Sequence, residues 1–157
     1  MSALTREAAA LIQAQRWAAL ATLEGGEPSA SMVAYALDGE RRGLLFFLSQ
    51  LAQHTQSLVQ HPRASLAVSE PDAHEGDPQR LQRVTLAGDA LVIPSGSDAF
   101  VQAGERYVAR FPDALPRFEL GDFLLFRFTP VAGRYVGGFA RAARFSWEQI
   151  AEEFTEP

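Results

Sequence analysis

Apolar and polar positions recur with two different periods along the chain, and each period predicts a different kind of element. Apolar residues return at helical spacing from Leu4 to Ile12, which predicts an opening amphipathic helix with Ser2 or Thr5 as its N-cap. Later segments show the same spacing behind further capping residues, so three more helices are expected. The predicted helices cover residues 4–16, 50–60, 96–110 and 146–154.

The other segments are short extended runs bounded by turn signals such as GGEP at 25–28 and GERRG at 39–43, which predict strands. Consecutive Leu and Phe in GLLFFLS fit a strand inside a barrel or sandwich, and Gly88 predicts a bulge or bend in a long strand. Short neighbouring strands with tight turns favour an antiparallel barrel over a doubly wound sheet. The six or seven predicted strands cover residues 17–24, 29–38, 43–49, 63–70, 80–94, 123–130 and 133–140.

Composition narrows the class of protein. The 157 residues are 47% hydrophobic, which is enough for one sizeable core, so a single domain spanning 1–157 is expected. The net charge of −5 argues against nucleic-acid binding, because affinity for nucleic acid comes mainly from cationic side chains. No basic leader precedes an apolar segment and no apolar run approaches membrane-spanning length, so we expect a cytoplasmic protein without membrane contact.

Every cationic side chain except histidine is arginine, because the sequence contains no lysine. A lysine Schiff base and a P-loop lysine are therefore excluded, and the absence of cysteine excludes thiolate chemistry. Any bound anion must be held by arginine, histidine, hydroxyl groups or backbone N–H groups. His74 lies among acidic residues at 71–78, a pattern that favours a solvated loop over a metal site, so no metal ligand is assigned.

Two segments contain candidate anion-binding groups. The start of the predicted helix after Ser49 offers free backbone N–H groups, with His54 one turn further on, although an ordinary capped surface helix explains the same residues. Arg83 lies within a predicted strand and needs a partner, for which a surface carboxylate is the alternative to a ligand. Arg141 follows paired glycines that allow close approach of a flat ligand, or that simply form a strand bulge.

Four segments in order resemble the FMN-binding split-barrel superfamily that contains the pyridoxamine 5′-phosphate oxidases. They are ATLEGGEPSASMVAYALD, LLFFLSQLAQHTQSLVQHPRASLAV, RLQRVTLAGDA and FRFTPVAGRYVGGFARA. Within the superfamily the chain is similar, over about residues 5–150, to the HugZ-like haem-utilisation branch without its C-terminal domain. The resemblance implies a mainly β protein with flanking helices, folded as a six-stranded antiparallel split β-barrel. It also implies a homodimer with FMN at the subunit interface.

The function implied by the resemblance is flavin-dependent oxidoreduction of an unknown small molecule, in which FMN supplies the redox chemistry and no side chain is catalytic. The alternative is a HugZ-type protein that binds or degrades haem, or a module that binds flavin or haem without turnover. The residues that the resemblance assigns to the cofactor are Ser31, Met32, Val33, Ser49, Gln50, Leu51, His54, Thr55, Arg83, Thr85, Gly138, Phe139 and Arg141.

The chain departs from the pattern of the oxidases themselves at the substrate-phosphate groups. Those enzymes carry an arginine and a lysine on the second strand, where this chain has Ser31 and Ala36. They also carry an SRK-type triplet after the third strand, where this chain has AQH. These differences argue against oxidation of a vitamin B6 phosphate.

Overall fold

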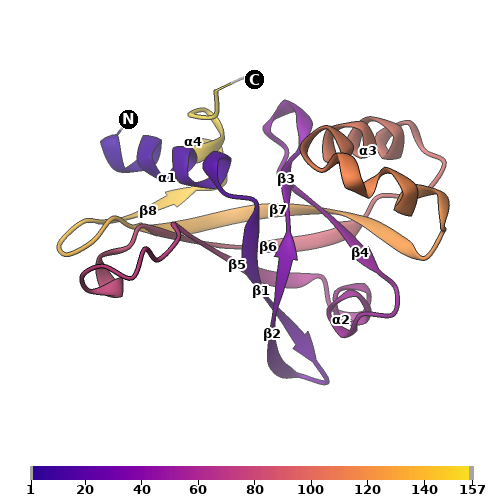
Figure 1. Cartoon of the computed structure of the whole chain (residues 1–157), viewed down its shortest axis with the longest axis horizontal. Helices are drawn as coiled ribbons and strands as arrows, with labels where there is room; N and C mark the ends of the chain where they lie inside the picture. Colours follow the sequence, from indigo (N-terminus) through magenta and orange to yellow (C-terminus); the bar gives the residue numbers. More distant parts are fainter. Residues whose placement is uncertain (1, 156–157) are drawn as a thin grey trace.

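The computed structural model describes residues 2–155 and contains one antiparallel sheet of eight strands, strongly twisted into a half-barrel and flanked by four helices (Figure 1). The strand order is β2-β1-β5-β6-β7-β4-β3, and β8 pairs with β7. The strands are β1 Trp17–Glu24, β2 Glu27–Ala34, β3 Ala36–Leu37, β4 Leu44–Ser49, β5 Arg63–Ser69, β6 Arg83–Val92, β7 Phe123–Val136 and β8 Ala142–Ser146. The helices are α1 Ala3–Ala14, α2 Gln53–Gln60, α3 Asp98–Arg110 and α4 Trp147–Ala151, with short 3-10 helices η1 Gly39–Arg41, η2 Pro78–Arg80 and η3 Pro112–Glu119.

The predicted class, mainly β with flanking helices, is confirmed, whereas the sheet has eight strands in place of the six expected. One extra strand arises because the second predicted strand breaks at Tyr35, whose backbone N–H donates to Arg16 O (3.0 Å), and resumes as β3. The other is β8, which returns beside β7 after a turn. No helix within residues 2–155 is both long enough and apolar enough to span a membrane.

The strand β7 corrects the prediction of two strands separated by a turn near Pro130. It runs unbroken from Phe123 to Val136, and β6 shifts register against it between Ala87 and Gly88. Gly88 pairs with Pro130, and a Cβ at Gly88 would collide with the backbone of Thr129 and Pro130. The predicted irregularity at Gly88 is therefore confirmed. Because glycine has no Cβ, β6 can pass close to Pro130, which lies within β7 and not in the predicted turn.

The strand β4 is buried on both faces, which explains its run of consecutive apolar residues. Leu44, Phe46 and Leu48 belong to the main hydrophobic cluster, which lies between the concave side of the sheet and the helices α1 and α4. On the other face of β4, Leu45 and Phe47 pack in a second cluster under α3 and η3. Phe47 stacks there on Phe118 with ring centroids 3.8 Å apart.

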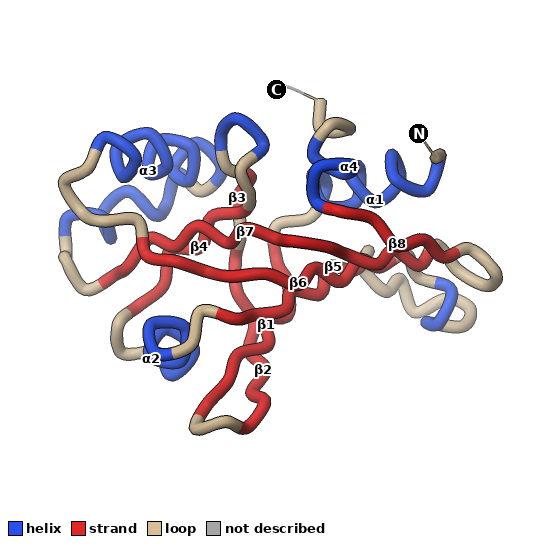
Figure 2. The backbone as a smooth tube through the Cα atoms, turned by 180° about the vertical axis from the view of Figure 1, so that it is seen from behind, coloured by secondary structure: helices blue, strands red, loops and turns tan. Residues whose placement is uncertain are grey.

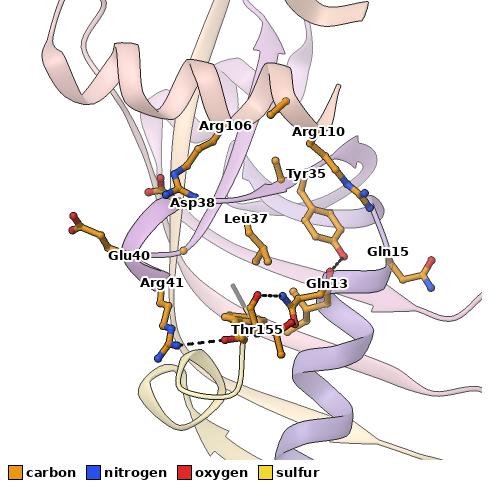
Figure 3. A pocket seen from close by; sticks show the side chains of 15 residues that line it. Gln13, Gln15, Tyr35, Leu37, Asp38, Glu40, Arg41, Arg106, Arg110 and Thr155 are labelled. Atoms are coloured by element: carbon orange, nitrogen blue, oxygen red, sulfur yellow. Dashed lines mark hydrogen bonds between the residues drawn. The ribbon is translucent and has the colours of Figure 1, made fainter. Parts of the chain in front are cut away.

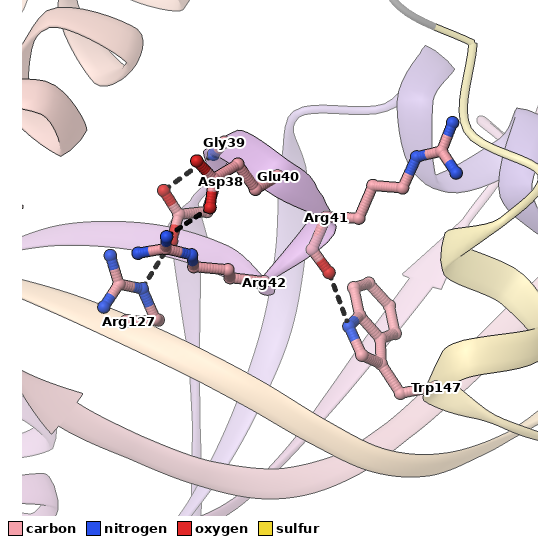
Figure 4. A network of polar contacts seen from close by, with 7 residues as sticks. All are labelled: Asp38, Gly39, Glu40, Arg41, Arg42, Arg127 and Trp147. Carbon is pink, nitrogen blue, oxygen red and sulfur yellow. Dashed lines mark hydrogen bonds and ion pairs between the residues drawn. The ribbon is translucent and has the colours of Figure 1, made fainter.

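The loop that contains η1 is anchored from both sides (Figure 4). The buried carboxylate of Asp38 forms an ion pair with Arg127 on β7 and accepts the backbone N–H of Gly39 (2.7 Å). From the C-terminal side, the indole Nε1 of Trp147 donates to Arg41 O at 3.0 Å. Because a buried carboxylate needs such partners, this loop is fixed against the sheet.

Candidate functional site

The structure places the thirteen candidate cofactor residues in three separate regions of the chain. The first is β2, the second is the start of α2, and the third is the beginning of β6 together with the β7–β8 turn. On β2, Ser31 and Val33 face the inside of the half-barrel, and Met32 faces outward and is exposed. The buried hydroxyl of Ser31 has no hydrogen-bond partner among residues 2–155.

The helix α2 begins later than predicted. Ser49 does not cap it, because Ser49 is still paired with Phe123 as the last residue of β4. Its hydroxyl accepts the N–H of Leu51 at 3.2 Å in a local turn, and α2 starts at Gln53 with Ala52 as a cap that provides no side-chain hydrogen bond. The predicted helix over 50–60 is thus shortened to Gln53–Gln60, and Gln50 and Leu51 lie exposed in the preceding turn.

A cavity of about 380 Å³ lies beside α2, and none of the side chains that line it is charged. Thr55 is one of them, and its buried hydroxyl lacks a hydrogen-bond partner within the described chain. Burial lowers the pKa of His54, which favours the neutral imidazole. The cavity therefore offers neutral hydrogen-bonding groups without a cation to balance a phosphate. The lining residues are Gln50, Thr55, Gln56, Val59, Gln60 and Leu124.

Arg83 and Thr85 lie far from α2 within the same chain. The chain passes from α2 directly into Arg63 of β5, which pairs with Asp89 of β6. Arg83 is six residues further along that strand, a distance of about 20 Å. Its guanidinium faces outward and donates to Gln79 O (2.7 Å) and Leu81 O (3.1 Å) of the preceding loop. One chain therefore does not bring Arg83 to the start of α2.

The third region is the turn between β7 and β8. Gly138 adopts a left-handed φ of 110°, which favours glycine. Phe139 is exposed, and the guanidinium of Arg80 lies 5.4 Å from its ring centroid. Arg141 forms an ion pair with Glu7 of α1, so this guanidinium already has a carboxylate partner.

Sequence reasoning missed a surface of small, exposed or half-buried side chains on the convex side of the sheet, which we call the alanine face. Strand pairing places its members side by side, since Ala19 pairs with Ala67, Ser65 with Ala87, and Ala87 with Ala132. The helices α1 and α4 pack on the opposite, concave side (Figure 2). Alanine at alternate positions of several predicted strands is the sequence pattern that could have revealed this face. The alanine face consists of Ala19, Ala21, Ala30, Ala67, Ala87 and Ala132.

Besides Arg83, which precedes Thr85 on the same side of β6, two arginines adjoin the alanine face. Arg134 of β7 pairs with Thr85 on one side and stands directly opposite Arg144 of β8 on the other. Within residues 2–155, no carboxylate oxygen lies within 4 Å of either guanidinium. Like charges opposite each other in a sheet repel, so this pair is suited to an anionic ligand. The apolar side chains of Met32 and Trp17 lie exposed at the other edge, 46% and 57% accessible.

Comparison with known proteins agrees with this architecture. The family model described as pyridoxamine 5′-phosphate oxidase matches residues 4–137. The chloroplastic heme oxygenase HOZ of Arabidopsis thaliana is 36% identical over 130 residues, which are 82% of this chain and 38% of the plant protein. The heme oxygenase HutZ of Vibrio cholerae is 26% identical over 135 residues, 85% of this chain and 76% of HutZ.

Among solved structures, a heme binding protein from Mycobacterium smegmatis superposes with a TM-score of 0.85 at 30% sequence identity. The superposition covers 97% of this chain and 61% of the mycobacterial one. This chain thus spans less than two thirds of the plant and mycobacterial relatives. Because the family model covers most of the sequence and the fold agrees, the chain belongs to the pyridoxamine 5′-phosphate oxidase family.

Proposed function

We propose that this protein binds haem, as a member of the haem-utilisation branch of its family. The proposal is supported by the names of its relatives, two of which are heme oxygenases and one a heme binding protein. The structural observation that carries it is the alanine face with Arg134 and Arg144 beside it. Haem is a broad apolar ring with two carboxylates at one edge, which matches an apolar surface beside two guanidinium groups that have no carboxylate partner within residues 2–155.

Each group on this surface has a defined task in the proposal. The small alanine side chains leave the surface open to a large ring, and they provide apolar contact. Arg134 and Arg144 hold the two propionates, and the Thr85 hydroxyl between them and Ala67 adds a hydrogen-bonding group. Bound haem supplies a redox-active iron. The three histidines lie elsewhere, on or after α2 and in the loop before β6, so no side chain is assigned to the iron.

Haem titration of the purified protein tests the proposal. We expect a saturable Soret band, and we expect Arg134→Ala/Arg144→Ala to raise the dissociation constant at least about tenfold, which corresponds to about 1.4 kcal/mol. The matched control is Arg6→Ala with Arg117→Ala, which removes two exposed charges away from this face and should leave affinity unchanged. A double variant at positions 134 and 144 that binds haem as well as the wild type would contradict the proposed site.

Haem degradation is the activity that the relatives' names suggest for such a site. The same complex, given ascorbate and O2, should lose its Soret band and yield an open-chain tetrapyrrole. Retention of intact haem under these conditions would limit the function to binding.

FMN is the second candidate, favoured by the buried Thr55 hydroxyl beside the α2 cavity, which has no hydrogen-bond partner in the described part of the chain. An unsatisfied buried hydroxyl is costly unless a ligand or water completes it. Absorbance and mass of the compound released on denaturation decide between the two. Protein that purifies with one FMN per chain and shows no haem-induced Soret band would favour the flavin function over haem binding.

A further inference from the structure

A pocket of about 400 Å³ lies away from the alanine face, where four distant parts of the sequence meet (Figure 3). Its walls come from the end of α1, from β3 with the η1 loop, from the last turns of α3, and from the segment after α4. The volume falls within the range of small-molecule sites. The fold therefore forms a concave site that is separate from the alanine face.

Three arginines line this pocket, and the two nearby carboxylates are already occupied. Arg106 and Arg110 reach toward it from α3, and Arg41 lies on the η1 side (Figure 3). Asp38 is taken by Arg127 and the N–H of Gly39, as described above, and Glu40 pairs with Arg42. Within the described residues, neither guanidinium of α3 has a carboxylate oxygen within 4 Å. Among residues 2–155, the pocket lining thus carries three guanidinium groups against two carboxylates.

The arrangement of the α3 arginines is unfavourable without an anion. Arg106 and Arg110 are four residues apart on one face of the helix, where like charges repel. The helix dipole favours a cation in the last turn, which accounts for Arg110 but not for Arg106 one turn earlier. The guanidinium of Arg106 also lies against Gly39, in the space that a Cβ there would fill, so it is held at the pocket edge.

The floor of the pocket is largely apolar. Tyr35, Leu37, Ile12 and Phe154 line it, and the Tyr35 hydroxyl donates to Ile12 O at 2.7 Å. Burial raises the pKa of Tyr35 well above its ordinary value, so this hydroxyl stays neutral and the pocket keeps its positive charge. A ligand here would meet Arg106 on the Asp38 side of the pocket and Arg110 on the far side of Tyr35, with apolar side chains between them (Figure 3).

We propose that this pocket is a second ligand site, for a small organic anion. The guanidinium groups of Arg106 and Arg110 attract its carboxylate or phosphate group, and its apolar body lies on Tyr35 and Leu37. The site is independent of haem binding, because none of these residues lies on the alanine face.

Calorimetric titration with phenyl phosphate, benzoate and inorganic phosphate tests this site. We expect at least one of the two aromatic anions to bind saturably, and inorganic phosphate to bind at least about tenfold more weakly because it has no apolar body. Comparison of phenyl phosphate with benzoate shows whether the site prefers a phosphate or a carboxylate. Absence of saturable binding by both aromatic anions, or equal binding of inorganic phosphate, would overturn the proposal.

Variants locate the binding within the molecule. Arg106→Ala/Arg110→Ala should weaken binding of the preferred anion at least about tenfold, and Arg106→Lys/Arg110→Lys should give an intermediate loss because the charge remains without the planar fork. Arg117→Ala and the double variant Arg134→Ala/Arg144→Ala should bind as the wild type does. If only the variant at positions 134 and 144 loses binding, the anion binds at the proposed haem surface. This result would overturn the assignment to this pocket.

Discussion

Arg83 stabilises the loop that precedes β6, because its guanidinium donates hydrogen bonds to two backbone carbonyl groups of that loop. The residue was a candidate for a cofactor phosphate, yet its donors are partly used within the chain. Its role in the described structure is therefore to hold residues 79–81 in place.

Replacement of Arg83 by alanine should loosen this loop without removing the proposed haem site. We expect Arg83→Ala to lower the free energy of unfolding by about 1 kcal/mol, since the lost bonds are charged but half exposed. Urea denaturation measures this loss, and limited proteolysis should show faster cleavage between residues 70 and 82. If the variant unfolds like the wild type but binds haem about tenfold more weakly, Arg83 contacts the ligand and does not mainly hold the loop.

Residue identity predicted only part of the candidate site. The absence of lysine limited the groups that can hold an anion to arginine, histidine, hydroxyl groups and backbone N–H groups. Residue types do not reveal which arginines form ion pairs with carboxylates, because ion pairing depends on strand register and on the path of the loops. Arg141 meets Glu7 from the other end of the chain, whereas Arg134 and Arg144 are opposite each other through a turn that the sequence placed elsewhere.

At the scale of elements, α1 is joined to the sheet through Tyr135 of β7. Its buried hydroxyl donates to Glu7 of α1 (2.9 Å) and also lies 3.0 Å from an acceptor oxygen of Gln82. Burial, together with the hydrogen bond to Glu7 and its negative charge, raises the pKa of Tyr135 to about 12. The contact is therefore maintained only while this hydroxyl keeps its proton.

The pH dependence of stability follows from this shift. Below pH 10 the tyrosine is protonated in both folded and unfolded states, and its contribution is complete. Between about pH 10 and pH 12 the unfolded state loses the proton first, so the free energy of unfolding falls. Urea denaturation across this range should show a smaller fall for Tyr135→Phe. If the free energy of unfolding falls equally with pH in the variant and the wild type, the raised pKa of Tyr135 would be contradicted.

Elements were predicted well where the local signal and the packing agree. The β1–β2 turn follows from two glycines with φ of 59° and 82°. Ser146 caps α4 in a capping box, as predicted, although α4 ends at Ala151 and not at residue 154. The errors at Pro130 and Ser49 share a cause. Both residues carry local turn or cap signals, and in both cases pairing with a distant strand decided the outcome.

At the scale of the whole molecule, the alanine face is an exposed surface that a second copy of the chain can cover. We propose a homodimer formed through this face with the ligand between the copies. Small side chains allow close approach of two sheets, and exposed Trp17 and Met32 add apolar area.

Light scattering after size exclusion tests the dimer. We expect a mass twice that of the 17.1 kDa chain, and a monomer for Ala67→Glu, which would bury a carboxylate in the interface. Gln102→Glu on the exposed side of α3 adds the same charge elsewhere and should remain dimeric. A wild type that elutes as a monomer at high micromolar concentration would contradict the proposal.

Strand β4 belongs to both hydrophobic clusters at once, with Phe46 in one and Phe47 in the other. Unfolding of β4 would expose both clusters at once, so we expect the two sides of the sheet to unfold together when this strand is lost. A ligand that stabilises the pocket under α3 therefore also raises the stability of the alanine face by mass action. Through this shared strand, occupancy of either surface protects the whole molecule from unfolding and from proteases that attack the unfolded chain.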